Sequence, residues 1–438
     1  MDLLIWEVLF IEIMALPSIL FRVPEYNIMS GKEGIHMPKW KKNLYILVVS
    51  QFMVMAAMTM IIPFLPLYLQ ELGVTNPQSI TIWAGFIFGI NFLSAFIVSP
   101  FWGKLADKYG RKPMVLRSGI GMAIVMILTG FATGPWSLLF LRLLNGTISG
   151  FIPASIALVS TNTPKEKAGY ALGILQSGAV AGGICGPLFG GLLAEAFGFR
   201  TIFNITGVGL ALAALTVWLF VKEDFTPPEA GEKTSTMDDF KKIAAVSPII
   251  QIYMVVFIIQ FALIGVNPLV SLYVEDLSGG VNSAFYAGLA VSSMGIANMV
   301  AAPILGKTSD NKGAYYTLFI CLIGAAVFSV PQAFVTNLWQ LIAMRFMTGL
   351  CLGGLLPAAN TLIRQLAPSG MESRTYGFSN SFLFLGSLLG PIIGGLLAAV
   401  YGIQGVFLVS AVMLAIAVII MKIYVIPGIK KRKDDSGG

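Results

Sequence analysis

The amino-acid sequence predicts an all-α membrane protein with twelve transmembrane helices in two pseudo-symmetric six-helix bundles. Of its 438 residues, 56% are hydrophobic and only 11% are charged, and the mean hydropathy is +0.83. A soluble protein of this length needs more polar surface than this composition supplies. Apolar runs of about 20 residues, each long enough to cross the hydrocarbon core as a helix, account for the excess. The second half of the chain also repeats motifs of the first.

Twelve apolar windows lie between polar breaks. The predicted spans are 44–70, 81–102, 114–132, 136–160, 169–195 and 201–221 in the first half, and 249–274, 284–305, 314–332, 338–362, 376–399 and 404–426 in the second. The sequence therefore divides into a first bundle at 37–221, a polar linker at 222–247, a second bundle at 248–426 and a basic tail at 427–438.

The loops between these spans alternate in charge, and the formal net charge is +7. One set contains nearly all the lysines and arginines, whereas the other contains only Arg200 beside Glu71, Glu195, Glu275 and Asp276. This asymmetry predicts that both termini lie in the cytoplasm. It assigns the basic residues to anionic lipid rather than to nucleic acid.

Internal repeats relate the two halves. Gly186–Pro187 recurs 204 residues later as Gly390–Pro391, Arg142 recurs 203 residues later as Arg345, and Asp107 recurs 203 residues later as Asp310. Two parallel repeats of this kind predict a binding site at their interface, near the membrane midplane, that opens alternately to each side.

Residues 1–36 do not resemble the rest. Their apolar stretch contains acids and lacks a basic start, so it makes a poor signal peptide. The basic lead that begins at Met37 indicates that Met37 is the native start and that 1–36 is an upstream extension. The alternative interpretation is an amphipathic helix on the membrane surface.

Three motifs carry a family resemblance that extends from Met37 to about Pro427. Residues 103–113 read GKLADKYGRKP, residues 138–146 read LLFLRLLNG, and residues 182–191 read GGICGPLFGG. The first closely resembles the signature loop of the major facilitator superfamily, the second its intramembrane arginine motif, and the third the antiporter motif of its drug:proton export branch. The resemblance implies the major facilitator fold and proton-coupled efflux of drugs, as in twelve-span bacterial multidrug exporters.

The signature loop is interpreted as a gate formed by Gly103, Asp107, Gly110, Arg111 and Lys112. Asp107 can pair with Arg111 or cap the positive N-terminus of a neighbouring helix such as the eleventh span. A half-exposed contact of this kind can break, which suits a latch for one transport state. The alternative is a charge cluster that only sets topology. Asp310 is a weaker candidate because its copy lacks the Arg111–Lys112 pair.

In the fifth span, Gly182, Gly186, Gly190 and Gly191 form a smooth face for close helix packing, and Pro187 bends the helix. Ordinary small-residue packing explains them equally well; the antiporter role comes from the resemblance. Gly390 and Pro391 are the second-half counterparts.

Arg142 lies roughly 9 Å inside the fourth span, where an arginine costs about 2.5–3.5 kcal/mol, so a partner is expected. The resemblance implies that Arg142 takes part in proton coupling; carbonyl contacts that stiffen the bundle are the alternative. The first span has no acid, and Glu195 lies at a depth similar to that of Arg142. The hypothesis is that Glu195 takes the proton and Arg142 tunes it, against the alternative of an interfacial acid in water. Arg345 has the same spacing in the tenth span.

Scattered amides, methionines and phenylalanines indicate a cavity for bulky amphipathic molecules. A sugar site would need denser polar pairing, and a dianion site would need basic clusters; neither is visible. The expected cavity residues are Gln51, Met55, Thr59, Phe151, Gln260, Asn267, Asn298, Asn360 and Phe382.

Other kinds of chemistry find little support. The three cysteines fall in apolar runs without metal-ligand spacing, and His36 is the only histidine. We expect no metal, no cofactor and no enzymatic activity. The protein is expected to act as a monomer on lipophilic small molecules and protons. A proton-coupled transporter of one metabolite, such as a sugar or an amino-acid derivative, is the alternative function.

Overall fold

The computed structural model describes residues 38–164, 167–223, 225, 236–368 and 371–429, and every regular element in these residues is a helix. Contacts divide the chain into two units, Met1–Pro38 and Lys39–Gly438, and all the helices named here belong to the second. The extension at 1–36 and most of the basic tail (430–438) lie outside the described residues, so those two predictions stay untested.

The first half is a bundle of six spans, two of which are interrupted. Its elements are α2 (Lys39–Met60), η1 (Ile62–Phe64), α3 (Leu65–Glu71), α4 (Pro77–Tyr109), α5 (Arg111–Gly130), α6 (Pro135–Ile148), α7 (Phe151–Asn162), α8 (Ala168–Phe197) and α9 (Phe199–Phe220). The first span is α2 with η1 and α3, and the fourth is α6 with α7.

The second half has the same plan. Its elements are α11 (Ile249–Val266), η3 (Asn267–Leu269), α12 (Val270–Ser278), α13 (Ser283–Lys312), α14 (Ala314–Gln332), α15 (Leu338–Leu366), α16 (Glu372–Ile420) and η4 (Met421–Val425). Between the halves, the linker contains α10 (Thr236–Ala244), whose nine residues are too few to cross a membrane.

Eleven continuous helical segments in the described residues are long and apolar enough to be membrane spans. The last, Arg374–Ile429, has 56 residues, and a straight helix of that length would measure about 84 Å against a hydrocarbon core of about 30 Å. Its backbone leaves the helical region at Gly402, where φ is 73° and ψ is 172°. The segment therefore contributes two spans, and the prediction of twelve is confirmed. Several helices extend past the predicted limits, because polar ends continue beyond the apolar core.

The internal repeat is visible in the backbone. Gly402 matches Gly198 (φ 77°, ψ 163°), and Gly110 (φ 96°, ψ 165°) matches Gly313 (φ 97°, ψ 145°). Each of these glycines joins two consecutive spans through a positive φ, which side chains other than that of glycine rarely tolerate. Corresponding turns in the two halves thus have a glycine with the same backbone conformation, as expected for two copies of one unit.

The two ends of the bundle differ in charge. The basic end contains the α4–α5 turn at Gly110 with Lys104, Lys108, Arg111 and Lys112. The acidic end contains Glu71, Glu195, Glu275 and Asp276. These two names are used for the ends from here on.

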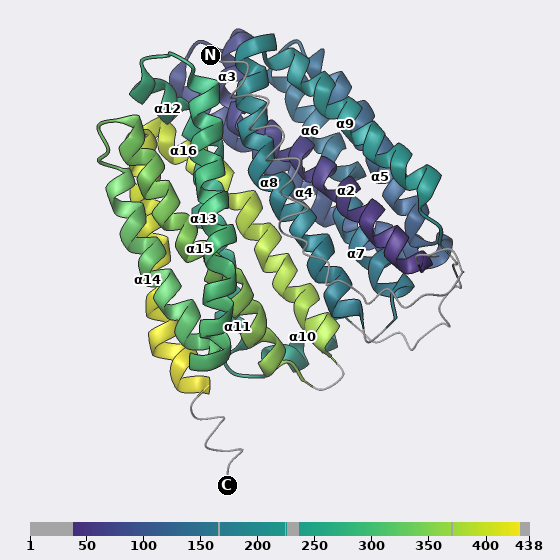
Figure 1. Cartoon of the computed structure of the whole chain (residues 1–438). Coiled ribbons are helices and arrows are strands. Elements are labelled where there is room, and N and C mark those ends of the chain that lie inside the picture. The colour runs from purple at the N-terminus through teal and green to yellow at the C-terminus, as the bar shows by residue number, and fades with distance from the viewer. Residues whose placement is uncertain (1–37, 165–166, 224, 226–235, 369–370, 430–438) are drawn as a thin grey trace, which may run out of the picture. The chain divides into compact units, whose positions relative to one another are not determined.

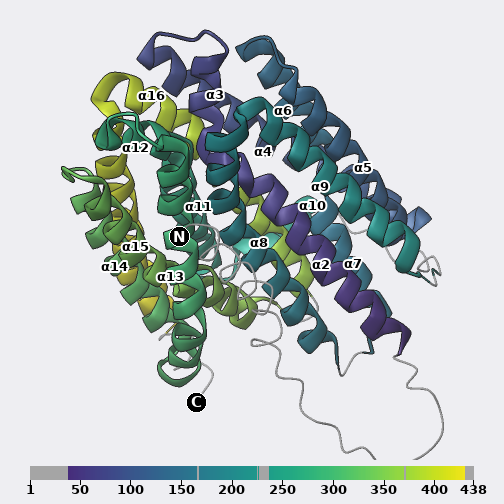
Figure 2. The same ribbon diagram turned by 45° about the horizontal axis from the view of Figure 1, so that its top comes forward.

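The halves meet along two helix pairs. Helix α8 packs against α13, and α4 packs against α16. Figures 1 and 2 both place α8 between α2 of its own half and α13 of the other. The two cross-half pairs are related by the repeat, because α16 is the counterpart of α8.

The hydrophobic core is continuous across the halves at the acidic end. One cluster of buried residues joins first-half side chains to those at the acidic ends of α11–α15, such as Leu269, Tyr273 and Ala287. A second cluster lies wholly within the second half and extends to its basic end, with members such as Ile252, Leu318 and Leu362. Cross-half apolar packing therefore closes the acidic end.

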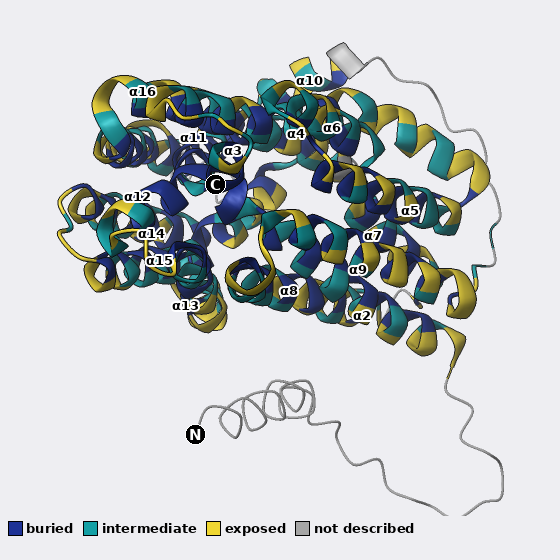
Figure 3. Ribbon diagram, turned by 90° about the horizontal axis from the view of Figure 1, so that it is seen from above, coloured by how far each residue is buried: buried dark blue, intermediate teal, exposed yellow. Residues whose placement is uncertain are grey.

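Exposed residues lie along the outward faces of the peripheral helices (Figure 3). Large apolar side chains are among the exposed residues in both halves, for example Phe131, Trp136, Trp218, Phe334 and Tyr401. Such faces are stable in lipid, where the backbone hydrogen bonds are already made within each helix.

The linker helix is attached to the second half. Arg374 at the start of α16 donates from Nη1 to Oδ1 of Asp239 at 2.8 Å, and the rings of Phe240 and Phe378 lie 5.0 Å apart. Asp239 is buried. The end of the linker is therefore a packed element on α16 rather than a simple tether.

Candidate functional site

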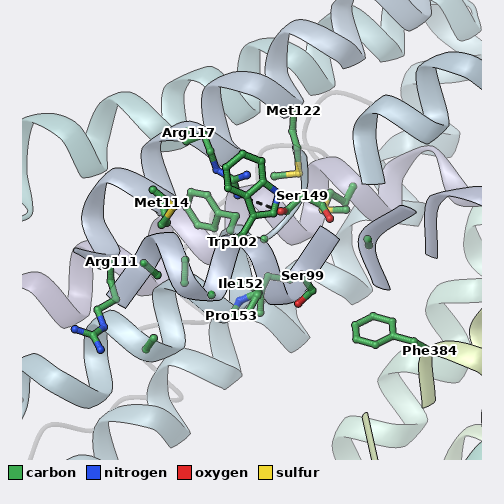
Figure 4. Close-up of a pocket in the computed structure, with 18 of the residues that line it drawn as sticks. Ser99, Trp102, Arg111, Met114, Arg117, Met122, Ser149, Ile152, Pro153 and Phe384 are labelled. Carbon is green, nitrogen blue, oxygen red and sulfur yellow. Dashed lines mark hydrogen bonds between the residues drawn. The ribbon is translucent and has the colours of Figure 1, made fainter. Parts of the chain in front are cut away.

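A cavity of about 550 Å³ lies between α4, α5 and α7, with Phe384 of α16 on its far side (Figure 4). Most of its wall is apolar, including Met58, Phe92, Met114, Met122 and Phe151. Gly103, Asp107 and Arg111 also line it, so the cavity extends to the basic end. The cavity extends to the basic end, while the continuous core closes the acidic end. This is the arrangement expected for one state of an alternating-access transporter.

The signature loop lies at the mouth of this cavity in an unlatched form. Asp107 pairs with Arg111 at 3.4 Å, one turn away, while its side chain stays 63% exposed. A Cβ added to Gly103 would meet no atom within 4 Å. Within the described residues, no hydrogen bond or ion pair joins Asp107 to α16. The loop therefore lines the basic end of the cavity, and its role as a gate stays a prediction.

The turn of the signature loop is capped by a residue that the sequence analysis did not single out. Glu223, just after α9, accepts hydrogen bonds from the backbone N–H groups of Arg111 and Lys112, both at 2.8 Å. The N-cap residue of α5 is Gly110, which has no side chain for this role. A carboxylate at a helix N-terminus satisfies free donors and complements the helix dipole. Glu223 therefore fixes the loop to the end of the first bundle.

We expect Glu223→Ala to destabilise the first bundle by about 0.5–2 kcal/mol, the usual cost of losing an N-cap. The measurement is thermal unfolding of the purified protein in detergent. Asp238→Ala, which removes an exposed acid of the same linker, is the control and is expected to unfold like the wild type. Equal unfolding of both variants would show that Glu223 does not support the loop.

The glycine motif holds α8 against two partners. A Cβ on Gly182 would meet Phe52 of α2, and one on Gly186 would meet Ala56 and Thr59 of α2. On the other side, Gly191 faces Ala284 of α13. The motif therefore lies in the seam between α2 and the second half, as close small-residue packing requires.

The second-half counterparts repeat this arrangement. Gly390 packs on Phe261 and Gly265 of α11, while the carbonyl of Pro391 lies against Gly85 of α4. Asp310 is exposed near the end of α13. Both halves therefore contribute one glycine- and proline-containing helix to the seam.

Neither intramembrane arginine has the partner that the sequence analysis expects. The Nε of Arg142 is buried without a hydrogen-bond partner among the described residues. Arg345 is 3% exposed, and its contacts are the sulfur of Met294 at 3.8 Å and the ring of Phe407 at 5.7 Å. It lines a cavity of about 20 Å³, which has room for about one water molecule. Within the part of the chain described here, no carboxylate forms an ion pair with either arginine.

Glu195 bridges the two halves at the acidic end. Its Oε1 accepts a hydrogen bond from the backbone N–H of Ala284 at 3.0 Å. Helix α13 starts at Ser283, and its N-cap residue Asn282 provides no side-chain hydrogen bond. Glu195 therefore caps a helix of the other bundle, and it makes no ion pair with Arg142 within the described residues.

Of the nine residues expected in the cavity, only Phe151 lines it in the described part of the chain. The others lie in helix interfaces. Thr59 donates to the carbonyl of Met55, Gln51 is fully buried, and the carbonyl of Asn360 accepts from Tyr376. Gln260 packs near Gly386, Asn298 near Gly353 and Phe382 on Tyr253, while Asn267 begins η3. The cavity wall is mostly apolar, and the assignment of substrate-contacting residues stays a prediction.

Two cavity residues were missed. Arg117 of α5 stacks over the ring of Trp102 of α4, with its guanidinium carbon 3.4 Å from the ring centroid. The ring is held by a hydrogen bond from its Nε1 to the carbonyl of Thr147 at 2.7 Å. Arg117 lies six residues after the start of α5 but only three residues inside the predicted span 114–132, so the depth argument that identifies Arg142 does not single it out.

A duplicated bundle around a cavity closed at one end defines a polytopic membrane transporter rather than an enzyme. The family model of the Major Facilitator Superfamily matches residues 47–285 and, in a second match, 252–438. The chain belongs to the Major Facilitator Superfamily.

Relatives agree along most of the chain. The multidrug resistance protein MdtG of Enterobacter lignolyticus (strain SCF1) is 41% identical over 373 residues, which cover 85% of this chain and 89% of that protein. MdtG of Serratia proteamaculans (strain 568) is 42% identical, with 85% and 91% covered.

Solved structures share the fold at low sequence identity. A bacterial homolog of the human lysosomal transporter Spinster, in an inward-facing and unoccupied conformation, has a TM-score of 0.72 and 16% identity, with 88% of this chain and 97% of that chain covered. A mutant of the nucleoside transporter NupG has a TM-score of 0.71 and 12% identity, with 86% and 98% covered.

Proposed function

We propose that this protein exports lipophilic and amphipathic compounds across the bacterial inner membrane in exchange for protons. The observation that carries the proposal is the methionine- and phenylalanine-lined cavity, which reaches the basic end while a continuous core closes the acidic end. Flexible thioether and aromatic side chains re-pack around differently shaped ligands. The names of the multidrug resistance relatives support the same function.

The charges support one orientation. Basic residues favour the cytoplasm, so in this proposal the basic end and both termini face the cytoplasm. The cavity then faces the cytoplasm and can take up compounds from the cell or the inner leaflet. A carrier for one sugar would need more hydrogen-bonding groups than this cavity wall provides.

Export then requires the acidic end to open. In this proposal Glu195 is the residue through which protons act. Its carboxylate holds α13 of the other bundle, and protonation from the outside removes the negative charge that favours the helix N-terminus. Arg200 is paired with Glu71 at 3.4 Å, and Gln70 donates to Glu275 at 3.1 Å, so Glu71 and Glu275 have their own partners. The role of Arg142 is to keep a positive charge inside the first bundle during the cycle.

Glu195→Gln is expected to abolish proton-driven export. The amide oxygen of glutamine can still accept the hydrogen bond from the Ala284 N–H, but an amide does not take up a proton at neutral pH. Export of a dye from energised cells is the measurement. Glu275→Gln, which changes an acid bonded across the halves at the same end, is the matched control and should retain export. A Glu195→Gln protein that still exports against a proton gradient would rule out this role.

The proposed function itself is tested by efflux from energised cells. The probes are a fluorescent lipophilic cation and a zwitterionic drug, each with and without a protonophore. We expect efflux that depends on the protein and stops when the proton gradient collapses. Purified protein in sealed liposomes that moves no compound under an imposed pH difference would overturn the proposal.

A further inference from the structure

Arg117 lines the cavity, and no acid among the described residues forms an ion pair with it. Its Nη2 donates to the carbonyl of Ser149 at 3.3 Å. Its Nε and Nη1 are buried and have no hydrogen-bond partner among the described residues. The acid that lines the same cavity, Asp107, is paired with Arg111 at the mouth.

A structural role explains only part of this arrangement. The Ser149 carbonyl lies at the break between α6 and α7, where Gly150 has a φ of 134°. A cation suits such a helix C-terminus. However, a guanidinium has five N–H donors, and this contact uses one of them. A buried donor without a partner costs about 1–3 kcal/mol, so a residue that only caps a carbonyl would be an expensive solution.

The surroundings of Arg117 suit an amphipathic acid. The planar guanidinium stacks on Trp102, and Met114, Met122 and Phe151 line the same cavity (Figure 4). Stacking fixes the plane of the guanidinium, and its fork matches the two oxygens of a carboxylate or a phosphonate. Trp102 covers the group in this state but is held by one hydrogen bond from its ring to Thr147. A ligand with an aromatic or aliphatic body can displace or slide along the ring while its acid reaches the fork.

We propose that Arg117 is a specificity-determining residue that selects substrates carrying one negative group beside an apolar body. This inference rests on the proposed export function and narrows its substrate class. It is consistent with the sequence analysis, which found no basic cluster for a dianion, since one buried arginine is enough for a monoanion when water is excluded.

The test compares dansyl-leucine with its methyl ester, which differ by one negative charge. Binding to the purified wild-type protein is followed by dansyl fluorescence. We expect the acid to bind about tenfold more tightly than the ester, as for a charge-assisted hydrogen bond, and Arg117→Gln to bring the ratio to about one. Met122→Leu, in the same cavity wall, should keep the wild-type ratio.

Two further comparisons keep the outcomes separate. Arg117→Lys retains the charge and a donor for Ser149 but loses the fork, so it should keep a reduced preference for the acid even if Arg117→Gln does not fold. Equal binding of acid and ester to the wild type, or an unchanged preference in Arg117→Gln, would overturn the inference. Failure of the proposed export function would appear elsewhere, as absence of proton-dependent efflux of the neutral ester from liposomes.

Discussion

Gly186→Ala is expected to destabilise the protein and to reduce export, whereas Gly183→Ala, on the same helix, is expected to leave both unchanged. A Cβ at Gly186 would overlap the Ala56 carbonyl and the Thr59 hydroxyl of α2. The carbonyl belongs to a helix backbone and cannot rotate away, so α8 must move from α2. Overpacking of this kind costs about 1–3 kcal/mol.

The control glycine lies in a different environment. A Cβ at Gly183 would have as its nearest neighbour the terminal methyl of Met55 at 3.7 Å, an ordinary contact with a flexible side chain. Alanine also favours a helix by up to about 1 kcal/mol relative to glycine, so this change is neutral or slightly stabilising.

Thermal unfolding in detergent and dye efflux from cells measure the two expectations. The comparison also separates the two interpretations of the motif. If Gly186→Ala unfolds at a lower temperature but the folded fraction transports normally, the motif serves packing alone. If transport falls further than the folded fraction, the seam takes part in the conformational cycle. Wild-type behaviour of Gly186→Ala in both measurements would show that the contact is not tight.

The sequence was sufficient to predict the fold because membrane helices are specified by composition and length. Apolar runs gave the twelve spans, and motif repeats gave the two halves. The α10 helix of the linker was not predicted, because its nine residues have no span signal and depend on contacts such as Asp239–Arg374. The N-terminal extension and the cytoplasmic orientation stay predictions.

The site residues were harder to predict, because the side chains that face the cavity depend on how each helix is rotated about its axis. The sequence places Met55 and Thr59 in the first span, but only the packed structure shows that their side chains face the glycines of α8. In a membrane helix, the side that contacts lipid and the side that contacts protein are both apolar, so the hydrophobic pattern does not show which side is which. Glu223 was missed for another reason. The linker contains several acids, and nothing in the sequence indicates which of them caps the N-terminus of α5.

Asp107→Asn is expected to lower the export rate by about tenfold while leaving the fold intact. In this state the carboxylate is mostly exposed and makes one long contact with Arg111, so little stability is lost. In the state with the basic end closed, the same carboxylate can cap the N-terminus of α16. The asparagine amide can still accept there, but a charge-assisted hydrogen bond (about 1.5–3 kcal/mol) is stronger than a neutral one (about 0.5–1.5 kcal/mol). The difference corresponds to a change of roughly tenfold in the ratio of closed to open states.

Asp310→Asn provides the matched control for this latch. Asp310 occupies the equivalent position in the second half and is exposed near the end of α13, but its loop lacks the Arg111–Lys112 pair. We expect its variant to export at nearly the wild-type rate. The deciding measurement uses two cysteines introduced on opposite sides of the basic end, because their cross-linking rate reports how often this end closes. Asp107→Asn should lower the cross-linking rate, and Asp310→Asn should not. If neither substitution slowed cross-linking, both acids would be assigned to topology alone; equal slowing by both would contradict a latch formed by the first half only.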